Sequence, residues 1–415
     1  MFAPLITIMA TPGLAIPLKV ASRCVMRLLA LPCLLSLLVP VTQCFAEDLP
    51  VNIAYVKQTG LTASASLALF KTPENNGVAG ALLGTDDSNT TGRFLKHHYA
   101  LTVLEDASGE ALTGKVQAWL TANNGPLILD VPDSTLKAIL ALPGADAGLM
   151  LNATNKSDSW RLNQCRAGLL HTSPSYAMLG DALGQFLMAK RWREWLLVSG
   201  TGEGDKAMAQ AFERASKRFG TKITGRKTWT FDTDLRRTSQ QEVPALTQGE
   251  DYDVVLVADT QNLFGFYLPY NTWLPRPVAG THGLKAASWH RSIEQWGAIQ
   301  LQNRFFEANQ RPMNDDDFNA WLAVRAVAEA VTRTKSNNSA TLYQYLMSDK
   351  FELAAFKGRK LTFRQWNGQL RQPIPLVQPE SLVSQSPQEG FLHPVTDLDT
   401  LGYDKPEVRC SMVKE

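Results

Sequence analysis

Residues 195–230 contain a succession of patterns that restricts the folds open to this chain. A short apolar run at residues 195–198 ends in a Gly-rich turn, and apolar side chains then recur at helical spacing through residues 208–219, which predicts a strand, a loop and an amphipathic helix. Asp205 can cap the start of the helix and Gly220 can end it, after which an extended pattern resumes. The unit is therefore β-α-β, which requires a parallel sheet covered by helices.

The glycines of this turn also match the dinucleotide-binding pattern G-x-G-x-x-A at residues 202–207. Glu203 and Asp205 oppose that interpretation because they place negative charge where a pyrophosphate would bind. No acidic residue ends the following strand to hold a ribose. A tight turn at a sheet edge is the favoured interpretation, and a nucleotide-using enzyme is the weaker alternative.

The first 46 residues have the composition of a secretory signal peptide. Three basic residues and no acidic one accompany an apolar run at residues 28–41, and small residues lead to a predicted cleavage site after Ala46. A retained membrane anchor is the alternative, although two prolines interrupt the run. Lipidation at Cys44 is disfavoured because Phe45 follows it. Met1 and Met26 both remain candidate start residues.

The mature chain is nearly neutral and has two cysteines. Removal of the signal leaves 38 basic residues against 39 acidic ones, without basic clusters, which argues against nucleic-acid binding. Cys165 and Cys410 remain, and in an oxidising compartment we predict that they form a disulfide. Two unrelated buried thiols are the alternative. Neither cysteine lies in a Cys-x-x-Cys motif or a Cys/His cluster, so redox catalysis and zinc binding are poorly supported.

About 370 mature residues exceed a single hydrophobic core and suit two α/β lobes. Strands and helices alternate through residues 51–151, and a second set begins at residue 167, which predicts two doubly wound parallel sheets. Within the first set, residues 61–84 are rich in small residues and broken by Pro73, and residues 87–94 are interpreted as a polar turn.

This order resembles the type I periplasmic binding proteins, the group that contains the leucine/isoleucine/valine-binding proteins of ABC importers. The segment at 195–220, with its Gly-Glu-Gly turn and its Arg-Phe-Gly end, is similar to the second-lobe motif of that group. More specific stretches resemble the branch found with pyrroloquinoline-quinone-dependent alcohol dehydrogenase systems. They are residues 89–95 (NTTGRFL), 358–373 (GRKLTFRQWNGQLRQP), 386–388 (SPQ) and 398–402 (LDTLG).

The resemblance covers essentially the whole mature chain and implies two lobes that close on a ligand in the cleft between them. It implies a monomeric periplasmic protein without catalytic residues, metal or cofactor that delivers a small molecule to an ABC transporter permease, with a quinoprotein dehydrogenase as a further candidate partner. The alternative is a periplasmic accessory protein of a quinoprotein system that does not transport a solute. The expected division is lobe 1 at 47–166 with 283–335 returning to it, lobe 2 at 167–282 with 336–400 returning to it, and a tail at 401–415.

In such a fold the ligand binds outside the carboxyl ends of the strands. The candidate ligand-binding residues are therefore those of the loops that follow the predicted strands. They are Gln58, Asp130, Asn152, Thr154, Ser173, Ser175, Tyr176, Thr201, Asp259 and Asn262.

Two departures from the amino-acid-binding relatives lead to a hypothesis about the ligand. Asp130 and Asp133 would repel a carboxylate unless they point away, and only Asp259 is placed to meet an ammonium group. We therefore predict that an ordinary branched-chain amino acid is not the ligand.

Four other constellations have weaker functional interpretations. The acidic run at residues 315–317 is expected to cap a helix rather than to bind a metal. A solvated pair is expected for His97 and His98. Ser173, His171 and Asp181 have the residue types of a hydrolase triad but lack the G-x-S-x-G elbow. The aromatic residues between 264 and 296 are expected to pack in a core more than to stack on a planar ligand.

Overall fold

The protein is described by a computed structural model that places residues 48–61, 72–123, 125–230 and 235–412. The predicted signal peptide at 1–46 lies outside these residues. No helix within the described ranges is both long enough and apolar enough to cross a membrane.

The first sheet, here sheet A, has five parallel strands in the order β2-β1-β3-β4-β5. Their bounds are β1 Leu49–Gln58, β2 His97–Asp106, β3 Leu127–Asp130, β4 Met150–Asn152 and β5 Leu169–His171. From β1 the chain adds β2 on one side and then β3, β4 and β5 on the other, so the topological switch point lies between β1 and β3.

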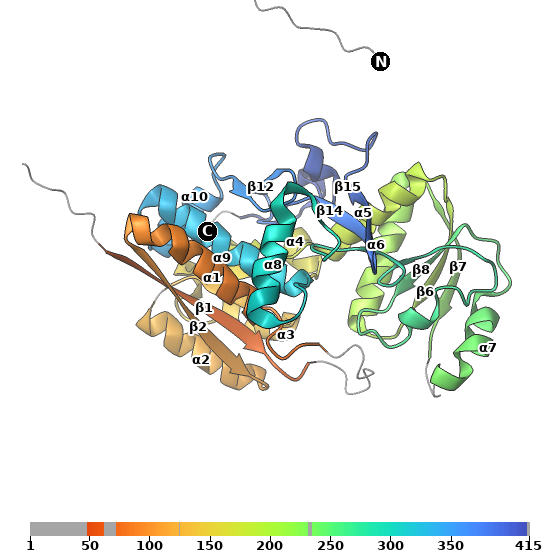
Figure 1. The fold of residues 1–415 in the computed structure, drawn as a ribbon, viewed down its shortest axis with the longest axis horizontal. Coiled ribbons are helices and arrows are strands. Elements are labelled where there is room, and N and C mark those ends of the chain that lie inside the picture. Colours follow the sequence, from red (N-terminus) through yellow and green to blue (C-terminus); the bar gives the residue numbers. More distant parts are fainter. Residues whose placement is uncertain (1–47, 62–71, 124, 231–234, 413–415) are drawn as a thin grey trace, which may run out of the picture. The chain divides into compact units, whose positions relative to one another are not determined.

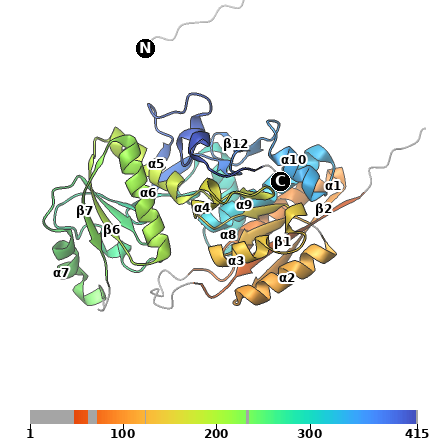
Figure 2. The ribbon, with the colours of Figure 1, turned by 180° about the vertical axis from the view of Figure 1, so that it is seen from behind.

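Helices cover both faces of sheet A (Figures 1 and 2). One face packs against α1, α8, α9 and α10, and the other against α2, α3 and α4. Their bounds are α1 Val78–Leu95, α2 Gly109–Ala122, α3 Asp133–Leu140, α4 Ser159–Leu162, α8 Ala298–Asn309, α9 Asp315–Thr334 and α10 Ser339–Leu346.

Helix α1 shows that the predictions of a broken segment and of a polar turn are wrong for residues 78–84 and 87–94, whereas the break at Pro73 is confirmed and residues 62–71 lie outside the described residues. Gly80 and Gly84 let α1 approach α9 closely: a Cβ at Gly80 would lie 1.8 Å from the carbonyl oxygen of Asp317. The hydroxyls of Thr85 and Ser88 donate to the carbonyls four residues earlier. Small residues and hydroxyls are poor helix signals in isolation, so tertiary packing decided this element.

The second sheet, here sheet B, has seven strands in the order β15-β14-β10-β9-β8-β6-β7. Strands β6 to β10 are parallel and repeat the order of sheet A, with the switch point between β6 and β8. The hairpin β14-β15 adds on antiparallel to β10. The bounds are β6 Glu194–Ser199, β7 Lys222–Thr228, β8 Val254–Ala258, β9 Val278–Gly280, β10 Leu284–Ala286, β14 Ile374–Gln378 and β15 Ser381–Ser386.

One face of sheet B packs on α5 (Tyr176–Ala189) and α6 (Glu203–Phe219), and the other on α7 (Leu235–Thr247) and the segment after β8. The predicted β-α-β unit at 195–230 is confirmed. Asp205 Oδ2 accepts the N–H of Gly202 at the start of α6, and Gly220 ends the helix in the left-handed region with φ of 70°. Strand β8 is buried throughout, as predicted.

The chain crosses between the two sheets three times, at residues 172–175, 287–297 and 372–373. Between the second and third crossings, α8 to α10 and a small sheet pack on the core beside sheet A. That small sheet contains β11 Leu353–Ala354, β12 Lys360–Phe363 and β13 Leu370–Arg371.

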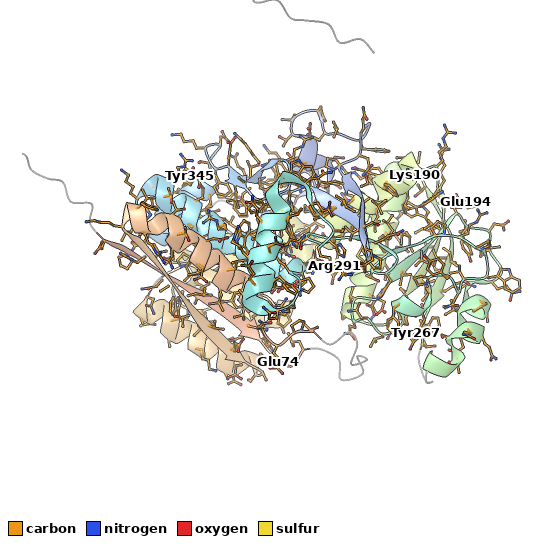
Figure 3. The ribbon with its side chains drawn as sticks, viewed as in Figure 1. Glu74, Lys190, Glu194, Tyr267, Arg291 and Tyr345 are labelled. Atoms are coloured by element: carbon orange, nitrogen blue, oxygen red, sulfur yellow. A yellow bond between two sulfur atoms is a disulfide. The ribbon has the colours of Figure 1, made fainter. Side chains whose placement is uncertain are left out.

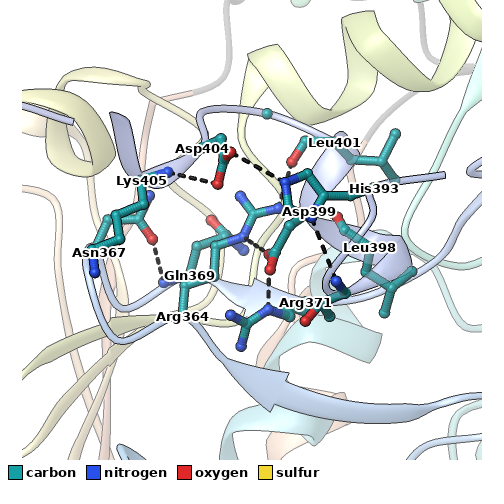
Figure 4. A network of polar contacts seen from close by, with 12 residues as sticks. Arg364, Asn367, Gln369, Arg371, His393, Leu398, Asp399, Leu401, Asp404 and Lys405 are labelled. Carbon is teal, nitrogen blue, oxygen red and sulfur yellow. Dashed lines mark hydrogen bonds and ion pairs between the residues drawn. The ribbon is translucent and has the colours of Figure 1, made fainter. Parts of the chain in front are cut away.

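The C-terminal segment is held by a buried ion cluster. Asp399 Oδ1 accepts one N–H from Arg364 and one from Arg371, each at 2.8 Å (Figure 4). Asp399 lies in the stretch 398–402 and both arginines lie in the stretch 358–373, so two of the resemblance motifs form one structural contact. The predicted Cys165–Cys410 disulfide is confirmed, with its Cα atoms 5.6 Å apart.

Candidate functional site

Sheet A presents charged side chains at its switch point. Lys57 at the end of β1 pairs in register with Asp130 at the end of β3. Lys57 Nζ donates to the carbonyls of Glu74 and Asn76 at 2.8 and 2.9 Å, at the approach to α1 (Figure 3 labels Glu74). Asp130 Oδ2 accepts the hydroxyl of Tyr55 at 3.1 Å. A cation and an acid therefore flank the position where open α/β sheets bind ligands.

The N-terminus of α9 meets the same edge. Asp316 Oδ2 accepts the amide of Asn76 at 2.8 Å, and its Oδ1 lies 3.8 Å from Lys156 Nζ in the loop after β4. The Lys156 and Asp316 side chains are 26% and 30% exposed. Lys57, Asp130, Lys156 and Asp316, here the switch-point charges, therefore form a balanced set that solvent can reach.

The electrostatics of this set shift two pKa values. Burial raises the pKa of Asp130 to about 6, and the nearby charge of Asp316 adds to the effect; Thr154, Lys57 and Tyr55 oppose it. Burial alone would lower the pKa of Lys156, but Asp316 and Asp315 raise it. Asp130 can therefore gain a proton near neutral pH, whereas Lys156 stays charged.

Other predicted residues at this edge bond to their own chain. Gln58 accepts the hydroxyl of Thr135 at 2.5 Å and donates to the carbonyl of Ala107 at 3.1 Å. Asn152 is buried and bonds with both its oxygen and its nitrogen to the backbone of Asn155. Thr154 is half-buried.

The residues of the first crossover also have structural partners. The buried Ser173 side chain bonds to the carbonyl of Pro174, and Ser175 caps α5 by accepting the N–H of Met178 at 3.3 Å. Tyr176 donates its backbone N–H to the carbonyl of Lys156 at 3.0 Å, which links the start of α5 to the edge of sheet A.

At the edge of sheet B, the acids are occupied by the protein itself. The carboxylate of Asp259, 1% exposed, accepts three backbone N–H groups, from Leu263, Phe264 and Gly265, at 2.7 to 2.9 Å. Asp205 Oδ1 accepts the N–H and the hydroxyl of Thr260 at 2.6 and 2.7 Å. These two carboxylates have little capacity left for a ligand.

Thr201 and Asn262 are exposed, and Asn262 adopts a left-handed conformation with φ of 56°. The structure therefore places the ten predicted residues at the two sheet edges and around the first crossover, and most of their polar groups have internal partners.

The expectation of a solvated pair is wrong for His97, which is buried, and holds for His98, which is exposed. The acidic run and the triad residue types resolve as structural contacts. Asp317 pairs with Arg311 and completes a capping box with Asn314, as expected for a helix start. Within the described ranges no group of three or more His, Cys, Asp or Glu side chains is arranged to hold a metal ion. The His171 ring bonds to Asn152, and Asp181 pairs with Arg214 and Arg218, so these groups do not form a triad with Ser173.

The aromatic segment divides between core and surface. Trp289 stacks on Phe318 with ring centres 4.3 Å apart, and Phe264 stacks on Trp229 at 5.4 Å. Tyr270 and Trp273 are exposed. The predicted packing role is therefore confirmed for Trp289 and Phe264.

A cavity of about 680 Å³ lies away from the strand ends, between α6 and residues 403–407. Two of its charged lining residues, Arg214 and Glu407, pair with each other, and Arg214 also bonds to the buried Asp181. We therefore place the candidate site at the switch-point charges and not in this cavity.

Sequence reasoning missed Asn76, Lys156 and Asp316. Lys156 lies two residues after the predicted Thr154 in the loop after β4, and Asp316 was interpreted only as helix-capping charge. Asn76 precedes a helix that was not predicted. One signal could have found Asp316: a helix that packs on a parallel sheet can place its N-terminus near the carboxyl ends of the strands, and Asp316 lies in the first turn of such a helix.

No model of a known protein family matches the sequence, and no curated protein matches it either. Solved structures match its fold. A branched-chain amino acid ABC transporter periplasmic ligand-binding protein from Burkholderia xenovorans superposes with a TM-score of 0.68 at 16% identity, covering 88% of this chain and 99% of that one.

Two further structures were solved with ligands. A branched-chain amino acid transporter substrate-binding protein from Streptococcus pneumoniae, in complex with isoleucine, has a TM-score of 0.61 at 13% identity and covers 82% of this chain and 99% of its own. A solute-binding protein of an ABC transporter from R. palustris, in complex with benzoate, has a TM-score of 0.61 at 11% identity, with 83% and 98% covered. This chain therefore has the two-lobed α/β fold of the type I periplasmic binding proteins.

Proposed function

We propose that this protein is the periplasmic solute-binding component of an ABC transporter and carries out no chemical step. The switch point of sheet A supports this role: Lys57, Asp130, Lys156 and Asp316 come from separate segments and meet where such folds bind ligands. The proposal includes export by the signal at 1–46, two lobes built on sheets A and B, and contact with a transporter permease. The lobe boundaries differ from the expected ones, because β5 and residues 339–371 pack with sheet A and β10 belongs to sheet B.

We further propose that the ligand is not a branched-chain amino acid. The acid expected to meet an ammonium group, Asp259, has both carboxylate oxygens engaged by backbone N–H groups. The further proposal that the transporter supplies a quinoprotein alcohol dehydrogenase system rests on the sequence resemblance alone. It suggests pyrroloquinoline quinone or an alcohol-derived acid as ligands to test.

A thermal-shift screen of residues 47–415 tests the proposal. The panel contains leucine, isoleucine, valine, short carboxylic acids, alcohols, aldehydes and pyrroloquinoline quinone. A ligand at a hundredfold its Kd adds about 2.7 kcal/mol, which for a chain of this length corresponds to a Tm rise of about 3 °C.

Two variants locate the binding site. Lys156→Met should abolish the shift, whereas Lys360→Met, an exposed lysine paired with Glu352, should retain it. Nanomolar binding of leucine by calorimetry would contradict the ligand hypothesis and leave solute binding intact.

The second candidate function is the accessory protein without transport. It is favoured by the self-bonded polar groups of Asn152, Ser175 and Asp259. No response across the whole panel would move the assignment to this candidate. A nucleotide-using enzyme is opposed by Asp205, which occupies the N–H of Gly202 at the start of α6.

A further inference from the structure

Lys357 is a buried lysine in the loop between β11 and β12, with 2% of its surface exposed. Its Nζ donates to Oε1 of Gln372 at 2.6 Å and to the carbonyl of Pro373 at 3.1 Å. The same atom lies 5.0 Å from the centre of the Phe318 ring. Among the described residues no carboxylate forms an ion pair with Lys357, so the groups in direct contact with its amine are dipoles and an aromatic face.

The partners of Lys357 connect it to the crossovers between the sheets. Gln372 and Pro373 form the third crossover, and Gln372 Nε2 donates to the carbonyl of Thr172 in the first one at 2.8 Å. The aromatic partner, Phe318, stacks on Trp289 of the second crossover. One side chain therefore contacts, directly or through one partner, all three connections.

The negative charge of Asp315 favours the protonated form of Lys357. Asp315 also bonds to the second crossover. Its Oδ1 accepts the N–H groups of Ser288 and Trp289 at 2.7 and 2.8 Å. Asp315 also acts on Lys156 and His290. The neighbours of Lys357 on the third crossover and on β15, Gln372 and Gln385, are uncharged. Asp315 therefore offers only partial compensation for a charge on Lys357.

The proton on Lys357 is weakly held as a result. Burial lowers the pKa of Lys357 to about 7, against the opposing effect of Asp315. The uncharged amine can still donate to both Gln372 and Pro373, so the contacts of this arrangement do not require the charge. A rearranged hinge that let the amine reach water would restore its ordinary pKa of about 10.4.

We infer that the protonation state of Lys357 controls the arrangement of the three crossovers. The neutral amine favours the arrangement described here, and the ammonium favours a rearranged one in which Lys357 is hydrated. Because the rearranged state binds the proton more tightly, its population relative to the described state rises as pH falls from about 10 to about 7. The ratio changes by up to about tenfold per pH unit and levels off below pH 7.

Single-molecule FRET on the folded protein tests this inference without a ligand. Dyes are attached at Lys137→Cys in α3 and Gln210→Cys in α6. Both positions are exposed, and the two helices pack on different sheets. The wild-type background should show the ratio of the two populations rising from pH 10 to pH 7 and constant below it. Lys357→Met should remove that dependence, and the control Lys360→Met should preserve it.

A population ratio that does not change between pH 6 and pH 10 in the wild-type background would overturn the inference, and so would an unchanged pH profile in Lys357→Met. If Lys357→Met fails to fold, Lys357→Gln replaces it. The wild-type profile remains decisive in either case.

Discussion

The switch points of the two sheets share one topology and differ in what their acids do. In sheet A, Asp130 accepts a hydroxyl from Tyr55, and the ammonium of Lys156 lies 3.8 Å from its nearest partner acid. In sheet B, Asp205 and Asp259 accept backbone N–H groups at 2.6 to 3.1 Å and are 1% exposed. The first edge keeps charge that a solute can reach, and the second has used its charge to build its own loops.

The difference shows that the role of an acidic residue at a strand end depends on the backbone that follows it. After β8 the chain turns so that the N–H groups of residues 263–265 converge on Asp259, and such bonds to a charged acceptor are strong. After β3 the chain enters α3 through Pro132, which has no N–H to offer. The carboxylate of Asp130 is therefore left to side chains.

Removal of the Asp259 carboxylate should have the largest effect on stability. Asp259→Ala would leave three N–H groups without their acceptor, two of them buried, and each such loss costs about 1–3 kcal/mol. We expect a loss of about 3–5 kcal/mol in urea unfolding. Glu203→Ala, at a side chain 92% exposed on the same edge, should change stability by less than about 0.5 kcal/mol. Equal losses in the two variants would remove the distinction between the edges.

Asp130→Asn should give a smaller effect of opposite sign. The folded pKa of Asp130, about 6, exceeds the value of 3.8 expected for the unfolded chain, so the folded state holds the proton more tightly. Its contribution to stability is full below about pH 4 and is lost as pH rises through about 6. The variant should therefore be more stable than the wild type by up to about 3 kcal/mol at pH 8 and nearly equal to it near pH 4.

Denaturant unfolding across this pH range measures the difference. A variant less stable than the wild type at pH 8 would show that the carboxylate of Asp130 is bound as firmly as that of Asp259.

The smallest effects are expected at groups with weak or no internal partners. Thr201→Ala, at an exposed position, should alter stability by less than about 0.5 kcal/mol, and Lys156→Met by less than about 1 kcal/mol. Calorimetric or thermal unfolding checks both. A loss above about 2 kcal/mol in Lys156→Met would make Lys156 a structural residue and would weaken its assignment to the ligand site.

The site was partly predictable from the sequence. Strand ends can be located from apolar runs, so the loops that contain Asp130, Thr154 and Asp259 were identified correctly as loops at sheet edges. Which side chains face outward was not predictable, because that depends on where neighbouring backbone N–H groups point. The contributions of Asn76 and Asp316 also required the packing of α1 and α9, which places residues 240 positions apart within hydrogen-bonding distance.

The sequence by itself determined most of the alternation of strands and helices and the two parallel sheets, because these follow from hydrophobic periodicity and helix capping, and the cysteine count favoured the pairing of Cys165 with Cys410. Only the tertiary structure decided that residues 78–95 form a helix, that Asp259 is a structural acceptor, and that Lys357 is buried among the crossovers. For Asp259 this depends on how the turn after β8 orients the N–H groups of residues 263–265. The helix and the burial of Lys357 each depend on the removal of a group from water by a partner distant in the chain. The residues near each group in the sequence do not identify that partner.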